Sequence, residues 1–245
     1  MRCLSFISLA VFALILVAPD KTIADEAAHR VAVELMIAVD VSHSIDGDEL
    51  TFQVESIAKA FRDDRLIRKI VGLHNGGVAV AVMFWAGKKE QLTVVPWQLI
   101  DSRASALIFA DTLVQRGKSP WTGLRFTALG DALSHAFVAF GANRFDGDRK
   151  VIDVSSDDPH NEGISLKAMR QQVIDAGITI NGLPILSGRD EHEERKHLID
   201  YYREQVIGGF GAFLVPALSN ADYASAMLRK LILEIAGDPA LDDAG

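Results

Sequence analysis

The sequence has almost no cysteine and no excess of basic residues. The single cysteine, Cys3, precedes a long apolar run near the N-terminus, so the rest of the chain forms no disulfide and offers no thiolate to a metal. Lysine and arginine total 25 against 33 aspartates and glutamates, which gives a formal net charge of -8. Because nucleic acids and anionic membranes are bound by basic surfaces, neither is an expected partner.

Several sequence patterns of enzymes are also absent. The chain has no Gly-x-Ser-x-Gly nucleophile turn, phosphate-binding loop or dinucleotide-binding glycine motif. The glycine-rich segment 208–211 precedes a predicted strand, whereas a phosphate cradle needs a helix N-terminus. His192 and His197 are five residues apart, a spacing that does not place both on one helical face as a zinc site would require. We therefore expect a protein that is not an enzyme.

Only one apolar run approaches the length of a membrane span, and it lies at the N-terminus. Leu4 to Ala18 is almost wholly apolar, follows Arg2 and precedes the small-residue sequence Thr22-Ile23-Ala24. This layout is typical of a secretory signal peptide, and a run of about 15 residues is short for a transmembrane helix. We expect residues 1–24 to be a signal peptide that is cleaved on export; an uncleaved membrane anchor is the alternative.

Residues 25–245 alternate between apolar strands and amphipathic helices, with no internal repeat or interdomain linker. Strands are predicted at 31–39, 78–85, 91–96, 150–155, 178–185 and 212–215, and helices at 47–63, 102–115, 127–140, 165–176, 190–206 and 220–236. This order favours a single α/β domain with its core at about 31–236. The expected fold is Rossmann-like and doubly wound, a mostly parallel six-stranded sheet with helices on both faces. The tight turn at 87–89 makes the third strand an antiparallel edge strand.

Oxygen-bearing side chains follow the first predicted strand. Asp40, Ser42 and Ser44 form the pattern Asp-x-Ser-x-Ser, in which a carboxylate and two hydroxyls can turn toward one point. Hard oxygen ligands of this kind suit Mg²⁺, Mn²⁺ or Ca²⁺. The alternative is a serine-rich turn in which an aspartate caps the next helix, a role that Asp46 or Asp48 can also fill.

Two further oxygen ligands are predicted at the same end of the sheet. Thr127 begins a predicted helix, and Asp157 directly follows the strand 150–155. With right-handed crossovers, both lie beside Asp40 at the carboxyl ends of the strands, where open α/β sheets bind their ligands. Taken singly, Thr127 can be a helix N-cap and Asp157 a turn residue.

The combination of Asp40, Ser42, Ser44, Thr127 and Asp157 resembles the metal-ion-dependent adhesion site of von Willebrand factor A domains. The wider sequence is similar to the DUF1194 proteins, a bacterial family with that domain. The similar stretches are VELMIAVDVSHSID, VPWQLID, TALGDAL, RKVIDVSSDDPHNEG, GITINGLPIL and VIGGFGAFLVP.

The resemblance implies a role for each residue at the site. Ser42 and Ser44 ligate a divalent cation directly, Thr127 does so directly or through water, and Asp40 and Asp157 act partly through water. The ion is Mg²⁺, with Mn²⁺ or Ca²⁺ as alternatives. An open coordination position then accepts a Glu or Asp carboxylate from a partner protein, so recognition completes the coordination shell.

The sequence departs from the family pattern next to the last aspartate. Asp158 stands where such domains often have glycine, and Ser156 stands where threonine is usual. The added negative charge of Asp158 either strengthens cation binding or repels an acidic ligand. Residues that we expect on the ligand-facing rim are His43, Trp121, Asp158, His160 and Asn161.

The sequence thus predicts an exported binding module, periplasmic or secreted from a bacterium, with no stable membrane span after signal cleavage. Two alternatives remain open. One is a metal-dependent hydrolase in which the same ion activates water, with Asp157 or His43 as base. The other is a structural envelope protein in which the site is vestigial.

Overall fold

The computed structural model describes residues 28–42, 45–118, 124–188 and 192–237. The predicted signal peptide, the predicted ligand Ser44 and the predicted rim residues His43 and Trp121 lie outside these ranges. Among the described residues, no helix combines the length and apolarity needed to cross a membrane.

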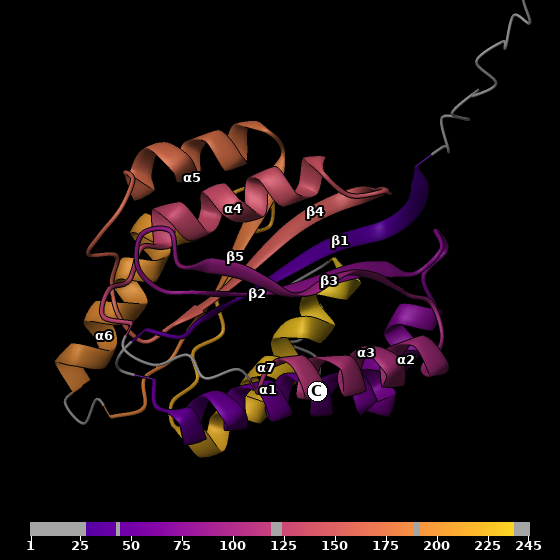
Figure 1. The fold of residues 1–245 in the computed structure, drawn as a ribbon, viewed down its shortest axis with the longest axis horizontal. Coiled ribbons are helices and arrows are strands. Elements are labelled where there is room, and N and C mark those ends of the chain that lie inside the picture. Colours follow the sequence, from indigo (N-terminus) through magenta and orange to yellow (C-terminus); the bar gives the residue numbers. More distant parts are fainter. Residues whose placement is uncertain (1–27, 43–44, 119–123, 189–191, 238–245) are drawn as a thin grey trace, which may run out of the picture.

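A five-stranded sheet with the strand order β3-β2-β1-β4-β5 forms the centre of the molecule (Figure 1). The strands are β1 (His29–Asp40), β2 (Val78–Trp85), β3 (Gln91–Ile100), β4 (Phe145–Ser156) and β5 (Ile178–Pro184). β1 pairs in parallel with β2 and β4, β4 pairs in parallel with β5, and β3 is antiparallel to β2. This confirms the predicted α/β class and the antiparallel edge strand.

The predicted sixth strand at 212–215 is wrong as a regular strand. Only isolated bridges run beside β5, between Gly182 and Leu214 and between Ile185 and Ala217. Gly209 and Gly211, just before this segment, have positive φ angles, and Pro216 has no N–H to donate within it. The segment therefore extends the sheet by a few hydrogen bonds without becoming a continuous strand.

Helices cover both faces of the sheet (Figure 1). One face is packed by α1 (Gly47–Arg62), α2 (Asp64–Val71), α3 (Arg103–Arg116) and α7 (Asn220–Ala236). The other is packed by α4 (Leu129–Gly141), α5 (Leu166–Asp175), α6 (His192–Tyr201) and a π-helical turn at Tyr202–Val206. The sequence did not predict α2, and the predicted helix 190–206 changes to π-helix after Tyr201.

The burial of β1 explains its nearly continuous apolar sequence. Leu35, Ile37 and Val39 belong to the core under α1 and α7, whereas Met36 and Ala38 belong to the core under α4 and α5. A strand covered on both faces has no solvent side, so apolar residues occupy both.

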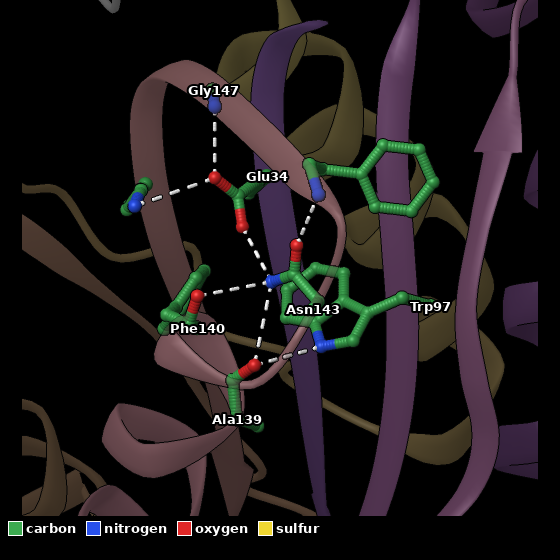
Figure 2. A network of polar contacts seen from close by, with 8 residues as sticks. Glu34, Trp97, Ala139, Phe140, Asn143 and Gly147 are labelled. Carbon is green, nitrogen blue, oxygen red and sulfur yellow. Dashed lines mark hydrogen bonds and ion pairs between the residues drawn. The ribbon is translucent and has the colours of Figure 1, made fainter. Parts of the chain in front are cut away.

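Glu34 is the exception within β1, and Figure 2 shows how its carboxylate is satisfied. It accepts hydrogen bonds from Asn143 Nδ2 at 2.7 Å and from the Gly147 N–H at 2.8 Å, and it pairs with Lys150 at 3.5 Å. Asn143 Nδ2 also contacts the carbonyl of Ala139, which accepts the indole N–H of Trp97. The network joins the end of α4 to β1, β3 and β4.

Candidate metal centre

The end of β1 brings a carboxylate and a hydroxyl to the carboxyl edge of the sheet. Asp40 is the last residue of β1 and is fully buried. Its Oδ1 accepts a hydrogen bond of 2.8 Å from the backbone N–H of Ser42. The N–H of Val41 donates to the carbonyl of Trp85 at the end of β2, at 2.9 Å. The loop after β1 therefore starts from a fixed position, with Ser42 folded back toward Asp40.

Burial dominates the electrostatics of Asp40. Loss of solvent, and after it the nearby charge of Asp157, raise the pKa of this carboxyl from 3.8 to about 7 in total. The hydroxyl of Ser156 opposes this shift by donating to Asp40 Oδ2 at 2.5 Å. A buried carboxylate of this kind is stabilised by a neighbouring positive charge, such as a cation.

The hydroxyl of Ser42 is a buried polar group in need of a partner. Ser42 is 2% exposed, and its Oγ makes no hydrogen bond of normal geometry to any described residue. Buried hydroxyls are nearly always bonded, because an unmet one costs free energy. A cation bound at this point satisfies the oxygen, so the residues present fit the ion that the sequence predicts.

Thr127 is held between the ends of β2 and β4. Its backbone exchanges two hydrogen bonds with Asn161: its N–H donates to Asn161 Oδ1 at 2.9 Å, and its carbonyl accepts from the Asn161 N–H at 3.0 Å. The following Ala128 donates to the carbonyl of Ala86, just beyond β2, at 2.7 Å. The N-cap of α4 is Ala128 and no side chain caps it, so Thr127 does not serve as the cap.

Asp157 follows the end of β4 directly, one position beyond Ser156. Because β4 pairs with β1 up to Val39 and Ser155, Asp157 lies beside the end of β1. Its charge raises the pKa of Asp40 and that of Glu49, a residue of the first turn of α1. Ser165 caps α5 and Asp46 caps α1, so neither Asp157 nor Asp40 is needed for those ends.

The three segments meet at the carboxyl end of β1. β1 lies between β2 and β4, and the Thr127 loop is bonded to residues after both of these neighbours. Asp40, Ser42, Thr127 and Asp157 therefore surround the carboxyl end of β1, with Ser44 outside the described residues. In the part of the chain that the structure describes, no three His, Cys, Asp or Glu side chains gather as a metal site. A cation here depends on the serine and threonine hydroxyls as well as the carboxylates.

The predicted rim residues have different environments. The backbone N–H of Asp158 donates to Ser156 Oγ at 3.2 Å, and the carbonyl oxygen of Asp158 lies 2.9 Å from the same hydroxyl, which has one proton to share between this carbonyl and Asp40. The backbone N–H of His160 donates to the Tyr201 hydroxyl at 3.0 Å, and partial burial lowers the pKa of its ring. Asn161 uses its side-chain carbonyl and its own N–H to hold Thr127.

Sequence reasoning assigned Ser156 and Glu49 no part in the site. Ser156 bonds the buried carboxylate of Asp40, and its place just before Asp157 was the available clue. Glu49 accepts a hydrogen bond of 3.4 Å from Ser187, beyond β5, and so spans the end of β4 where Asp157 lies. No sequence spacing connects residues 49 and 187.

Family comparison agrees with these observations. The profile of the family described as "Protein of unknown function (DUF1194)" matches residues 30–239. The chain belongs to the DUF1194 family. No curated protein matches this DUF1194 chain.

Solved structures share its fold at low sequence identity. A von Willebrand factor type A from Catenulispora acidiphila is 18% identical with a TM-score of 0.52, and the match covers 83% of the DUF1194 chain and 42% of that chain. The pilus adhesin SpaC from Lactobacillus rhamnosus GG is 12% identical with a TM-score of 0.58, covering 83% and 31%. The mussel byssus protein PTMP1 "with zinc occupied MIDAS motif" is 16% identical with a TM-score of 0.57, covering 85% and 49%.

These matches show that the DUF1194 chain has the von Willebrand factor A fold. It spans about a third to a half of the length of those three chains. At such identities the likeness concerns the fold, so the role of each site residue stays a prediction.

Proposed function

We propose that this protein is a binding module that recognises a partner protein through a divalent cation held by Asp40, Ser42, Ser44, Thr127 and Asp157. The observation that carries the proposal is the pair of buried groups at the end of β1: the Asp40 carboxyl, and the Ser42 hydroxyl, which makes no hydrogen bond of normal geometry to a described residue. The zinc-occupied motif of the mussel protein, which has the same fold, supports a cation at this place.

The expected ion is Mg²⁺, with Mn²⁺ or Ca²⁺ as alternatives, because the ligands are hard oxygens. Neutral hydroxyls leave much of the ion's charge uncompensated. The ion then attracts a carboxylate of the partner, so we propose a protein ligand that offers Glu or Asp. The described hydroxyls and carboxylates provide no base that is clearly separate from the ion, and we therefore prefer binding to hydrolysis.

We further propose that residues 1–24 are a signal peptide and that residues 25–245 act outside the cytoplasm, in the periplasm or after secretion. Two of the structural neighbours named as pilus proteins, SpaC and the vWF domain of the pilus tip protein Mfa5 from Porphyromonas gingivalis, support a surface role. N-terminal sequencing of the protein recovered from a bacterial periplasm tests cleavage after Ala24.

A thermal melt of residues 25–245 tests the cation site. Relative to EDTA, Mg²⁺ at about 100 times its Kd stabilises a selectively bound fold by roughly 2.7 kcal/mol. For a domain of this size, that raises Tm by about 5–10 °C. The shift disappears in Asp40→Ala and persists in Asp111→Ala, which changes an exposed aspartate of α3. Equal shifts in the two variants contradict the proposal.

Binding to a library of peptides tests the partner chemistry. We expect captured peptides to contain Glu or Asp and to release in EDTA, and their Gln or Asn versions to lose affinity. If the protein binds the cation but shows no preference for carboxylate peptides, the proposed partner chemistry is wrong and the proposed metal site stands. Turnover of ester or phosphoester substrates that depends on Asp40 would favour the hydrolase instead.

A further inference from the structure

Four polar side chains are buried together between α7 and the sheet. Lys230 and Glu234 come from α7, Asp153 from β4 and Asn181 from β5, and each is at most 2% exposed. The Lys230 ammonium contacts one oxygen of Asp153 and one of Glu234. Asn181 Nδ2 donates to the same Glu234 oxygen at 3.1 Å. We call these four residues the α7 ion cluster.

The charges of the cluster do not balance when all its groups are ionised. One ammonium faces two carboxylates, so a net negative charge is buried. Asp153 Oδ2 and Glu234 Oε2 have no hydrogen-bond partner among the described residues. Burying an uncompensated charge is costly, and binding one proton removes it.

The groups around the cluster offset this imbalance only in part. The charge of the Arg149 guanidinium interacts with that of Glu234, but its hydrogen bonds go to the backbone carbonyls of Glu234 and Ile235, at 2.8 and 3.1 Å. The buried Tyr223 hydroxyl lies near Asp153 and is neutral, because burial raises its pKa. Phe213 brings no charge: its ring lies 5.7 Å from the Lys230 ammonium, and its backbone N–H donates to Asn181 Oδ1 at 3.1 Å.

The charged residues of the helices packed beside α7 lie along its N-terminal half, away from the cluster. Lys59 of α1, Asp63 at the junction of α1 and α2, and Arg65 of α2 border the segment from Ala221 to Leu228. They lie along the first turns of α7, whereas Glu234 is in its last turn.

A cavity of about 240 Å³ borders the cluster at the last turn of α7. Asn181 and Glu234 line it from inside, and Leu233, Gly237 and Phe213 line it from α7 and the neighbouring loop. This space lets water approach the last turn of α7, and it gives that turn room to move away from the sheet.

We propose that the α7 ion cluster is a proton-dependent latch, which holds the C-terminal end of α7 on the sheet when protonated and loosens it when the proton is lost. The latch is independent of the cation site. Burial, followed by the charge of Asp153, raises the pKa of Glu234 from 4.5 to about 7. A raised folded-state pKa gives stability that is complete below pH 4.5 and is lost as pH rises through about 7.

The test measures the equilibrium constant of unfolding at pH 6 and at pH 8. It uses an Asp40→Asn background, since Asp40 also has a pKa of about 7. Loss of one proton with a pKa of about 7 increases the unfolding constant about tenfold between these values. Adding Glu234→Gln, which imitates the protonated carboxyl, removes this dependence. Adding Glu194→Gln, on the exposed face of α6, leaves it unchanged.

Hydrogen exchange, corrected for the intrinsic effect of pH, locates the change. We expect residues 231–236 of α7 to lose protection at pH 8 while α5 keeps it. An unchanged pH dependence in Glu234→Gln, or equal loss of protection in α5 and α7, overturns the proposal. If Glu234→Gln does not fold, Asp153→Asn provides the same test, because it also leaves one carboxylate opposite Lys230.

Discussion

The hydroxyl of Ser42 combines burial with the lack of a described hydrogen-bond partner. If it is a metal ligand, Ser42→Ala loses affinity for Mg²⁺, since even residues that only support a metal ligand often contribute 10–100-fold. We expect a loss of roughly tenfold or more by calorimetry. The domain should fold normally, because the substitution removes only a contact to Asp40 that lacks normal hydrogen-bond geometry. Thr51→Ala, on the exposed face of α1, is the control; equal affinities in the two variants would show that Ser42 is not a ligand.

Asp40 makes cation binding dependent on pH. Because its pKa is raised to about 7, protons compete with the cation below neutrality. Affinity should fall about tenfold from pH 8 to pH 6. Without metal the sign is opposite: Asp40 contributes stability below pH 3.8 that is lost as pH rises through about 7. Calorimetric titration at several pH values checks the first effect, and Asp40→Asn should bind weakly with a flat profile.

At the scale of structural elements, the loop before α4 depends on the loop after β4. Asn161→Ala removes the hydrogen bond from its side chain to the backbone of Thr127, at a cost of about 1 kcal/mol in stability. We expect a several-fold loss of cation affinity as well, because Thr127 is less firmly placed. Asn75→Ala, which removes a loop hydrogen bond to Asp148, should reduce stability alone. If the two variants bind the cation with similar affinity, Asn161 contributes to stability and not to the cation site.

Replacing either of two glycines of α4 by alanine should change stability in opposite directions. A Cβ at Gly130 would lie 2.3 Å from the carbonyl oxygen of Ile164, whereas a Cβ at Gly141 meets nothing within 4 Å. Gly130→Ala should therefore destabilise the protein by about 1–3 kcal/mol. Gly141→Ala should be neutral or stabilise by up to about 1 kcal/mol. Urea unfolding measures both, and a stable Gly130→Ala would mean that the loop 160–165 moves easily.

The strands and helices that the sequence predicted well are those with a strong apolar pattern. β2 and α7 have the predicted bounds, because each is a regular element with clear ends. α2 was missed because a single residue, Asp63, separates it from α1 and caps it. Local spacing was enough to predict Ser42 and Asp40 as site residues, while the contacts of Ser156, Asn161 and Glu49 join distant segments and leave no pattern in the sequence.

At the scale of the whole molecule, two apolar cores share one sheet. The cores lie on opposite faces of β1, so neither forms without that strand. We therefore predict that residues 25–245 unfold in one cooperative transition. Tryptophan fluorescence and far-UV circular dichroism should give the same urea midpoint. Separate midpoints would contradict the single-domain proposal.

The strand order also determines at which point of synthesis the central sheet can form. β1 is the third strand of five across the sheet, and its partner β4 begins more than a hundred residues later, at Phe145. Contacts so distant in sequence slow folding, since a long loop must close before they form. The N-terminal third of the chain therefore waits, without a finished core, until β4 has been made. If the chain is exported as proposed, we expect this delay to keep the newly made chain open for passage through a narrow channel.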